Sequence, residues 1–275
     1  MTTSILLLGE SDSGKTHYGA QLLGRLLVRK GALRMNGAAP TLGPFQAALQ
    51  SLNDGRAAGH TAQATHHDSH WPVIDANGRT ADLYWPDYGG EQVKEILELR
   101  RIPPRWRARA QASDAWIVLV RPEALRPRKD IFSRPLADLR GRRDAPATFR
   151  LSDQARVIEL LQMLLYARGA GLRTPLATPA LTLLLSCWDE LNLPDGSRPA
   201  DVMRQRLPML ADFVAANWQP EAFTTMGLSA LGQALSADTP DDVFMMKGPE
   251  AFGFVVHPDG KSDADLTQPI AQLLT

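Results

Sequence analysis

Residues 4–16 read SILLLGESDSGKT, and this stretch decides how the rest of the chain is interpreted. The apolar run at residues 5–8 predicts a buried parallel strand. It leads into G-x-x-x-x-G-K-[ST], in which glycines let successive backbone N–H groups turn toward a phosphate. Lys15 would place its ammonium group on the β- and γ-phosphates, and the Thr16 hydroxyl is a hard oxygen ligand for Mg²⁺. Residues 17–29 then predict a helix whose N-terminus faces the anion, so the stretch is expected to bind a nucleotide.

Composition excludes several classes of protein. The 275-residue chain is 44% hydrophobic and has one cysteine, Cys187, so it has no internal disulfide and fits a reducing cytoplasm. Its net charge is zero, which gives no bulk attraction to nucleic acid. The first residues lack a basic signal region, no apolar run could span a bilayer, and the last residues form no prenylation box. We therefore expect a cytoplasmic protein without a nucleic-acid partner or a membrane anchor.

A second motif follows a predicted hairpin. Residues 71–75 and 80–85 are predicted as strands joined by an Asn-Gly turn. The second strand ends in residues 87–91, which read DYGGE. A carboxylate at a strand tip followed by glycines suits the second half of a phosphate site, where Asp87 holds Mg²⁺ through a water and the Gly90 N–H contacts a γ-phosphate. The D-x-x-G pattern is too short to be specific by itself, and it indicates a phosphate site because it follows a hairpin that comes after the phosphate-binding loop and its helix.

The remaining pattern predicts one α/β domain. Further strands are expected at residues 115–120, 181–186, 222–226 and 251–257, and helices at residues 45–52, 92–111, 151–168, 200–217 and 266–274. The helix at residues 92–111 is expected to be broken or kinked near Pro103 and Pro104. This alternation predicts three layers: a mostly parallel sheet with one antiparallel hairpin strand, and helices on both faces. Residues 121–150 are basic and lack a clear period, so they are predicted as an insertion. A short C-terminal extension is expected from about residue 233.

In this order, five stretches resemble the Ras-like GTPases of the translation-factor-related (TRAFAC) class. They are the loop at residues 9–16, a threonine at 61 or 65, residues 87–90, residues 186–189 (SCWD) in place of Asn-Lys-x-Asp, and residues 229–230 (SA). The D-x-x-G-E run makes the sequence most similar to the bacterial double-GTPase group. The resemblance implies binding of GTP and GDP with Mg²⁺, slow hydrolysis of GTP, and a switch role in a bacterial signalling or defence system. Its partner would be a protein effector or an operon-encoded protein, or a second copy of the chain.

The same resemblance implies a set of site residues. Nucleotide binding would involve Gly9, Ser13, Gly14, Lys15, Thr16, His17, Trp188, Asp189, Ser229 and Ala230. Catalysis would involve Lys15, Gly90 and Glu91, and the Mg²⁺ ligands would be Thr16, Asp87 and Thr61. Thr61 is preferred because the residues that precede it, 55–60, contain glycines, as in the double-GTPase group. Thr65 is the alternative, because its separation from Asp87 is the one familiar in Ras-like proteins.

The base-binding motif departs from the family pattern but keeps its terminal carboxylate. Asp189 can accept hydrogen bonds from guanine N1–H and from the exocyclic amine. Adenine offers neither donor there, so a buried Asp189 would reject it. The family lysine is replaced by Cys187. Trp188 could stack on the base instead, or could equally face the core.

Other residues have two interpretations each. Glu91 stands where the family has a glutamine, so it either orients the attacking water or only caps the following helix. Five arginines could supply an arginine finger or form a solvated, partner-facing helix surface: Arg100, Arg101, Arg105, Arg107 and Arg109. The histidines at 66, 67 and 70 could hold zinc, but without cysteines they fit a polar loop better.

Two rival functions remain open at this point. One is a P-loop kinase or ATPase, which the carboxylate at position 189 argues against. The other is a pseudo-GTPase scaffold that binds nucleotide without hydrolysing it, which the altered Glu91 and SCWD motif favour.

Overall fold

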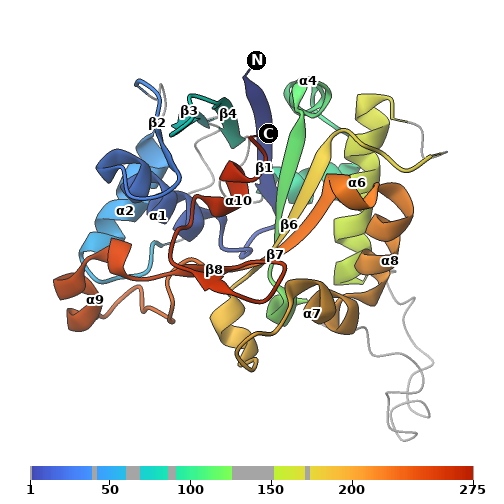
Figure 1. Cartoon of the computed structure of the whole chain (residues 1–275). Helices are drawn as coiled ribbons and strands as arrows, with labels where there is room; N and C mark the ends of the chain where they lie inside the picture. Colours follow the sequence, from blue (N-terminus) through green and yellow to red (C-terminus); the bar gives the residue numbers. More distant parts are fainter. Residues whose placement is uncertain are drawn as a thin grey trace, which may run out of the picture.

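The computed structural model describes residues 2–38, 42–59, 69–85, 91–125, 152–170 and 174–274. Within these ranges nine strands form one sheet, in the order β2-β3-β4-β1-β5-β6-β7-β8-β9 (Figure 1). The strands are β1 (Thr3–Gly9), β2 (Leu33–Met35), β3 (Ser69–Asp75), β4 (Thr80–Trp85), β5 (Ala115–Val120), β6 (Ala180–Ser186), β7 (Phe223–Ser229), β8 (Phe254–Val256) and β9 (Ser262–Asp263).

The centre of the sheet is parallel and both edges are antiparallel. β4, β1, β5, β6 and β7 pair in parallel, in agreement with the predicted mostly parallel sheet. The predicted hairpin places β3 antiparallel to β4, and β2 pairs antiparallel with β3. At the other edge, β8 and β9 add two more antiparallel pairings, which the sequence pattern did not indicate.

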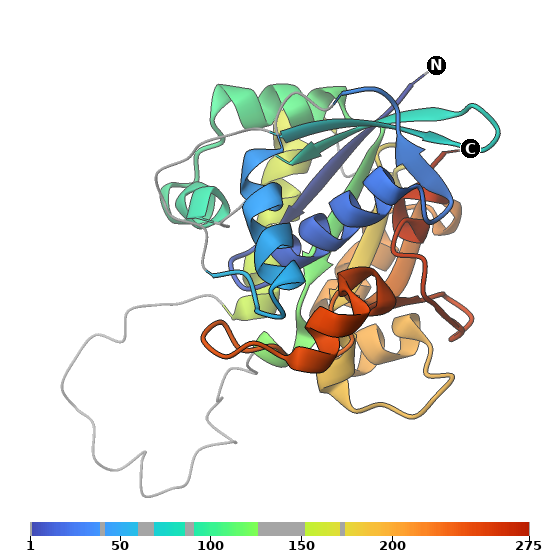
Figure 2. The same cartoon turned by 90° about the vertical axis from the view of Figure 1, so that its left-hand side faces the viewer.

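Helices cover both faces of the sheet, which confirms the three-layer α/β prediction (Figures 1 and 2). One face carries α1 (Lys15–Val28), α2 (Gly43–Asn53), α9 (Asp242–Lys247) and α10 (Gln268–Ala271). The other carries α3 (Glu91–Leu99), α4 (Pro104–Ala112), α6 (Asp153–Arg168), α7 (Pro199–Arg206) and α8 (Pro208–Asn217). Short 3₁₀ turns are η1 (Pro122–Ala124), η2 (Trp188–Leu191), η3 (Pro220–Ala222) and η4 (Pro249–Ala251).

The apolar run that precedes the phosphate motif is buried because it is covered twice. Side chains alternate across a strand, so Ile5 and Leu7 pack under α1 while Leu6 and Leu8 pack under α3 and α6. A strand covered on both sides needs a continuous apolar sequence, which is what β1 has. The strand therefore holds the start of the loop at residues 9–15 in a fixed place.

Several elements differ from the sequence prediction in ways that have local causes. The helix expected at residues 200–217 is two helices, because Pro208 has no N–H to continue α7. The break expected near Pro103 and Pro104 in the helical stretch at residues 92–111 is confirmed, because α3 ends at Leu99 and α4 begins at Pro104. No strand was predicted at β2 and no helix at α9.

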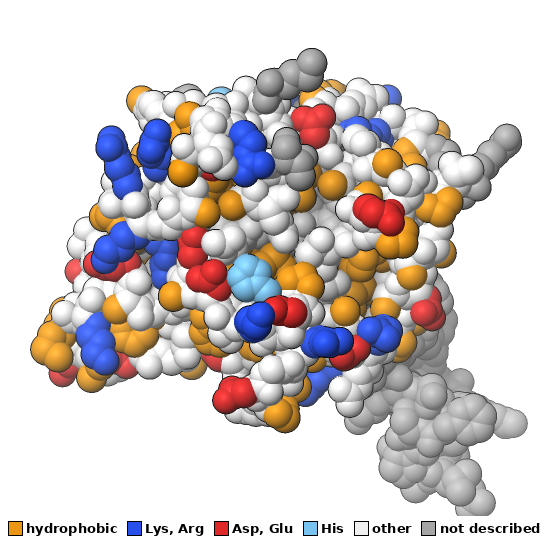
Figure 3. Space-filling view, in the orientation of Figure 1, with side chains coloured by type: hydrophobic (Ala, Val, Ile, Leu, Met, Phe, Trp, Pro, Cys, Tyr) orange, Lys and Arg blue, Asp and Glu red, His pale blue; other side chains and the backbone are white. Residues whose placement is uncertain are grey.

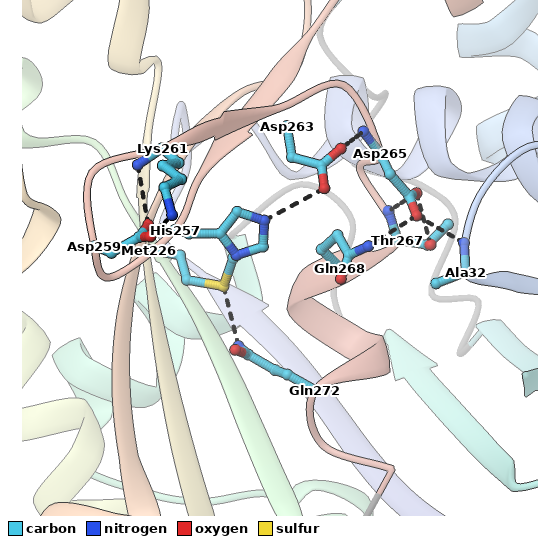
Figure 4. A network of polar contacts seen from close by, with 10 residues as sticks. All are labelled: Ala32, Met226, His257, Asp259, Lys261, Asp263, Asp265, Thr267, Gln268 and Gln272. Carbon is cyan, nitrogen blue, oxygen red and sulfur yellow. Dashed lines mark hydrogen bonds and ion pairs between the residues drawn. The ribbon is translucent and has the colours of Figure 1, made fainter. Parts of the chain in front are cut away.

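The C-terminal segment, residues 233–274, is bound to α1 and is an integral part of the domain. Tyr18 Oη donates to the Leu266 carbonyl at 3.1 Å, Gln21 Nε2 donates to the Pro249 carbonyl at 3.0 Å, and Arg25 Nη2 donates to the Phe252 carbonyl at 2.6 Å. The Asp265 carboxylate accepts from the Ala32 N–H at 2.6 Å and from the Thr267 hydroxyl at 2.7 Å (Figure 4). The extension predicted from about residue 233 thus covers the outer side of the first helix.

The surface carries charges of both signs. In the view of Figure 3, Lys and Arg side chains are interspersed with Asp and Glu, in keeping with a net charge of zero. In the described part of the chain, no helix combines the length and the apolar character needed to cross a membrane.

Candidate nucleotide-binding site

A cleft of about 780 Å³ opens where β1, β6 and β7 end. Parallel strands that point the same way end at one edge of the sheet, so the loops that follow them meet there. The cleft wall is formed by residues 11–17 after β1, residues 57–59, Arg121 after β5, four residues at and after the end of β6 (Ser186, Cys187, Asp189 and Glu190), and seven residues at and after the end of β7 (Leu228, Ala230, Leu231, Gln233, Ala234, Leu235 and Ala237). The sequence motifs at residues 9–16, 186–189 and 229–230 are therefore brought together by the fold.

The loop between β1 and α1 is shaped by its glycines. Gly14, the N-cap of α1, has a φ of +81°, and it provides no side chain to cap the helix. A Cβ at Gly9 would lie 2.6 Å from Ser13 Oγ and 2.8 Å from the Leu119 carbonyl, so only glycine fits there. The loop directs the N-terminus of α1 at the cleft, an arrangement that attracts anions.

Lys15 lies at the base of this loop. Its side chain is 4% exposed, and Nζ donates to the carbonyls of Gly9 at 2.7 Å and Glu10 at 2.6 Å. Ser13 Oγ lies 3.4 Å from the same nitrogen. The ammonium group is therefore held by the loop it belongs to, next to Thr16 in the cleft wall.

At the opposite end of the cleft, a serine fixes an aspartate. Ser229 Oγ donates to Asp189 Oδ1 at 2.5 Å, and the Gly232 N–H donates to Ser229 Oγ at 2.9 Å. Ser229 is fully buried at the end of β7, while Asp189 and Ala230 line the cleft. The two motifs that the sequence placed in one base-binding site are hydrogen-bonded to each other.

Trp188 faces the core, which is one of the two alternatives that the sequence left open. It is 7% exposed, and a Cβ at Gly227 would lie 2.6 Å from its ring, so the indole packs flat against β7. Cys187, with a φ of +52°, and the 3₁₀ turn η2 direct Trp188 back onto the sheet. The indole does not line the cleft and is not placed to stack on a base.

Cys187 itself lines the cleft where the family has a lysine. Burial, with a smaller contribution from Glu190, raises the pKa of its thiol to about 11. The thiol therefore stays protonated at neutral pH and offers a neutral, polarisable surface in place of a cation.

An ion pair that the sequence did not predict links the two ends of the cleft. Arg121, just after β5, donates from Nε to Glu190 Oε2 at 2.8 Å and from Nη2 to Oε1 at 2.6 Å. Its Nη1 also lies 3.5 Å from the Asp12 carbonyl in the phosphate-binding loop. This bidentate bond raises the pKa of the Arg121 guanidinium. Nearby, Ser186 is 2% exposed, and its hydroxyl has no hydrogen-bond partner among the residues that the structure describes.

His17 connects α1 to the segment that precedes the predicted Thr61. Its Nε2 accepts from the Ala58 N–H at 3.1 Å. Burial, followed by the charge of Arg121, lowers the pKa of the imidazole, so it is neutral at pH 7. The C-terminal segment holds the same stretch from the other side: the Ala57 N–H donates to the Ser236 carbonyl, and the Asp241 N–H to the Gly55 carbonyl.

Part of the predicted site lies outside the described residues. This applies to Thr61, Thr65, Asp87 and Gly90, to His66 and His67, and to residues 126–151 of the predicted basic insertion. Glu91 is the first residue of α3. Their predicted roles stay predictions.

The remaining predicted groups are used elsewhere. The arginines 100, 101, 105, 107 and 109 do not line the cleft; Arg109 lies 3.9 Å over the Tyr84 ring, and Arg100 pairs with Glu159 at 3.0 Å. His70 bonds Asp82 at 2.6 Å, and the described residues contain no group of three metal-ligating side chains.

A phosphate-binding loop after the first parallel strand, with an Asp–Ser pair at the far end of the same cleft, defines a P-loop GTPase. The family model described as Double-GTPase 1 matches residues 6–273, and the chain belongs to this family. This confirms the Ras-like resemblance inferred from the motifs. A search of curated proteins gave no match.

Similar solved structures include small GTPases and a translation factor. The Arl6 small GTPase from Trypanosoma brucei with a bound nucleotide analogue is 12% identical, with 84% of this chain and 88% of that chain covered and a TM-score of 0.39. The signal recognition particle receptor SRb-GTP/SRX complex from Chaetomium thermophilum is 17% identical, with 86% and 94% covered and a TM-score of 0.39. The bacterial selenocysteine-specific elongation factor EF-Sec is 11% identical, with 84% and 26% covered and a TM-score of 0.37.

Proposed function

We propose that this protein binds GTP and GDP with Mg²⁺ in the cleft, hydrolyses GTP slowly, and acts as a molecular switch. The observation that carries the proposal is the hydrogen bond from Ser229 to Asp189, which holds a carboxylate in the cleft wall opposite Lys15. A fixed carboxylate accepts from both guanine donors and would be left unpaired by adenine. Family membership supports the same reading.

The phosphates would be bound by the N-terminus of α1 and by Lys15. The lysine would exchange its bonds to the Gly9 and Glu10 carbonyls for bonds to the β- and γ-phosphates, which are stronger because both partners are charged. The Thr16 hydroxyl in the cleft wall is a hard oxygen donor and suits Mg²⁺, which Asp87 and Thr61 or Thr65 would help to hold. When bound, Mg²⁺ neutralises charge on the phosphate oxygens.

Hydrolysis would depend on positioning more than on covalent chemistry. The Gly90 N–H would contact the γ-phosphate, and Glu91 would orient the attacking water in place of the usual glutamine. A carboxylate at this position adds negative charge near the phosphate, so we expect slow turnover until a partner contributes. We propose a cytoplasmic role in a bacterial signalling or defence system, with a protein effector, an operon-encoded partner or a second copy of the chain.

Base choice is the sharpest test of this function. Asp189→Asn should lower GTP affinity about ten- to a hundredfold, because a hydrogen bond to a charged group contributes about 1.5–3 kcal/mol. The variant should gain affinity for xanthosine triphosphate, whose C2 carbonyl accepts from the new amide NH₂. Displacement of a fluorescent GDP analogue by GTP, ATP and xanthosine triphosphate measures this. Asp195→Asn, an exposed carboxylate outside the cleft, is the matched control.

Two further results would separate the rival functions. If ATP displaces the analogue as well as GTP does, the guanine assignment is wrong and an ATPase is the better description. If GTP binds tightly, depends on Lys15, and is not hydrolysed in a single-turnover assay, the protein is a scaffold that uses nucleotide structurally. Lys15→Ala should remove binding of every nucleotide while leaving the far-UV circular dichroism spectrum unchanged.

A further inference from the structure

A second hollow, with no lining residue in common with the nucleotide cleft, lies between the α3–α4 connection and α6. Its volume is about 660 Å³. The connection contributes Arg100 and Arg101, α4 contributes Arg107, and α6 contributes Glu159, Met163 and Tyr166. We call this hollow the arginine groove.

The apolar side chains in and beside the arginine groove are unusually exposed. Tyr166 is 82% exposed although it lies on a helix whose other face is in the core. Leu99, the last residue of α3 and the neighbour of Arg100, is 58% exposed. Single exposed apolar residues are common on proteins. Two of them beside a hollow that also contains Met163 indicate a surface suited to an apolar side chain of another molecule.

The positive charge of the arginine groove indicates that the bound molecule is acidic. Glu159 is the one acidic residue in the lining, and it pairs with Arg100 through Oε1 and Nε at 3.0 Å. In the described part of the chain, Arg101 and Arg107 form no ion pair, so two positive charges remain in excess. A guanidinium binds a carboxylate through two parallel hydrogen bonds, which makes acidic side chains the natural complement.

The groove wall is continuous with the segment expected to respond to nucleotide. α3 begins directly after residues 87–90, the predicted second half of the phosphate site. The Trp106 indole N–H donates to Gln92 Oε1 at 2.8 Å, which ties the first turn of α3 to α4. The Arg100–Glu159 pair ties the end of α3 to α6. A movement of α3 that follows the nucleotide would therefore change the spacing of Arg100 and Arg101 from α6.

We propose that the arginine groove binds an acidic segment of a partner protein, with one apolar side chain against Met163 and Tyr166 and flanking carboxylates on Arg101 and Arg107. A peptide fits better than a nucleic acid because two arginines, which form no ion pair within the described residues, stand beside Met163 and Tyr166 and do not form the row of positive charges that follows a phosphate backbone. The nucleotide dependence of this binding rests on the proposed switch function. The binding itself does not.

Selection of random 12-residue peptides displayed on phage, against the whole chain with a non-hydrolysable GTP analogue, tests this groove. Enriched peptides should contain Asp or Glu on both sides of Leu, Phe or Trp. Fluorescence anisotropy of one such labelled peptide should show at least tenfold weaker binding to Arg101→Glu/Arg107→Glu and to Tyr166→Ala. Arg34→Glu/Arg198→Glu, which reverses two exposed charges outside the groove, should bind normally.

The remaining outcomes overturn parts of the proposal separately. Enrichment of no sequence, of sequences without acidic residues, or of peptides that bind the charge-reversed variant equally well overturns the groove assignment. Binding of a single-stranded oligonucleotide that is lost in the same variant assigns the groove to nucleic acid instead. Equal peptide affinity with GDP and with the GTP analogue removes the coupling to the switch. If the protein binds no nucleotide, the proposed function fails, but peptide binding to the nucleotide-free protein still tests the groove.

Discussion

Arg121 and Glu190 form an ion pair in the wall of the same cleft as Ser186, which stands where the family motif has an asparagine. Among the described residues, the buried Ser186 hydroxyl has no hydrogen-bond partner. Arg121 bonds Glu190, which follows Asp189, the residue proposed to bind the base, and Arg121 Nη1 lies 3.5 Å from the Asp12 carbonyl of the phosphate-binding loop. We infer that this pair holds the two ends of the cleft at the separation that one nucleotide requires.

Glu190→Gln gives the most decisive test of this inference. Removing a negative charge from an anion-binding cleft should strengthen nucleotide binding if only Coulomb attraction matters. If Glu190 acts by positioning Arg121, the variant should instead release a fluorescent GDP analogue about three- to tenfold faster, the effect expected of a partly exposed ion pair worth about 1 kcal/mol. Stopped-flow dissociation measures this.

The double variant Arg121→Ala/Glu190→Gln serves as the control for that measurement. Because each single change breaks the same contact, the double variant should release the GDP analogue no faster than Arg121→Ala alone. Additive effects, or slower release from Glu190→Gln, would show that the two side chains act independently.

Residues within one motif could be predicted from the sequence, but contacts between residues outside the motifs could not. Residues 9–16 were recognised from their spacing within one loop, and Asp189 and Ser229 from their resemblance to the GTPase motifs. Arg121 and Glu190 lie 69 positions apart, so no local pattern connects them. The direction of Trp188 depends on the left-handed backbone at Cys187, which a non-glycine residue rarely adopts and which a sequence does not announce.

At the scale of elements, α1 and the segment at residues 54–59 are joined through His17. Burial sets the pKa of this imidazole below its unfolded value near 6.5. The folded state therefore favours the neutral form of His17. The contribution of neutral His17 to the free energy of unfolding is fully present above about pH 6.5. As pH falls below that value the unfolded chain takes up the proton first, so this contribution is lost progressively through the folded-state pKa. Protonation of Nε2 also removes the acceptor for the Ala58 N–H.

His17→Gln should remove this pH dependence. A glutamine oxygen can accept from the Ala58 N–H and does not titrate near neutrality. We expect the free energy of unfolding, measured by urea denaturation, to fall more steeply between pH 7.5 and pH 5.5 in the original protein than in the variant. Amide exchange at Ala58 should accelerate over the same range only with histidine present. Parallel pH profiles for the two proteins would contradict the neutral assignment of His17.

The continuously apolar strands of the sheet centre were predicted correctly, whereas three short elements, β2, α9 and β9, were not. β1, β5 and β6 are buried on both faces, and their sequences show it. The six-residue α9 depends on contacts that form only in the folded chain. Asp241 accepts from the Phe244 N–H at 2.8 Å, and the Phe244 ring stacks on Phe252 with centroids 4.3 Å apart. Isolated helices of this length are unstable, so local sequence carries little signal.

The domain as a whole is closed by the C-terminal segment. Its main attachment is Asp265, which accepts from the backbone N–H groups of Ala32 and Thr267 and from the Thr267 hydroxyl (Figure 4). This carboxylate joins the last part of the chain to the connection between α1 and β2. Several donors share one acceptor group, so its removal leaves all of them without a partner.

Asp265→Ala should lower the free energy of unfolding by about 2–3 kcal/mol, because unsatisfied donors carry a desolvation cost. Urea denaturation followed by tryptophan fluorescence measures it. The control is Asp259→Ala, which removes an exposed ion pair with Lys261 and should leave stability unchanged. Equal effects of the two substitutions would mean that Asp265 does not anchor the segment.

The attachment of the C-terminal segment to α1 also determines when the contacts of α1 can be completed during synthesis of the chain. Tyr18 bonds a carbonyl 248 positions later, and Gln21 bonds one 228 positions later. On the ribosome, the helix that presents the phosphate-binding end is therefore made early and stays uncovered until almost the whole domain has emerged. Contacts of such long range form late. A nascent chain arrested before residue 249 would lack the carbonyl partners of Tyr18, Gln21 and Arg25, so the outer side of α1 would stay uncovered.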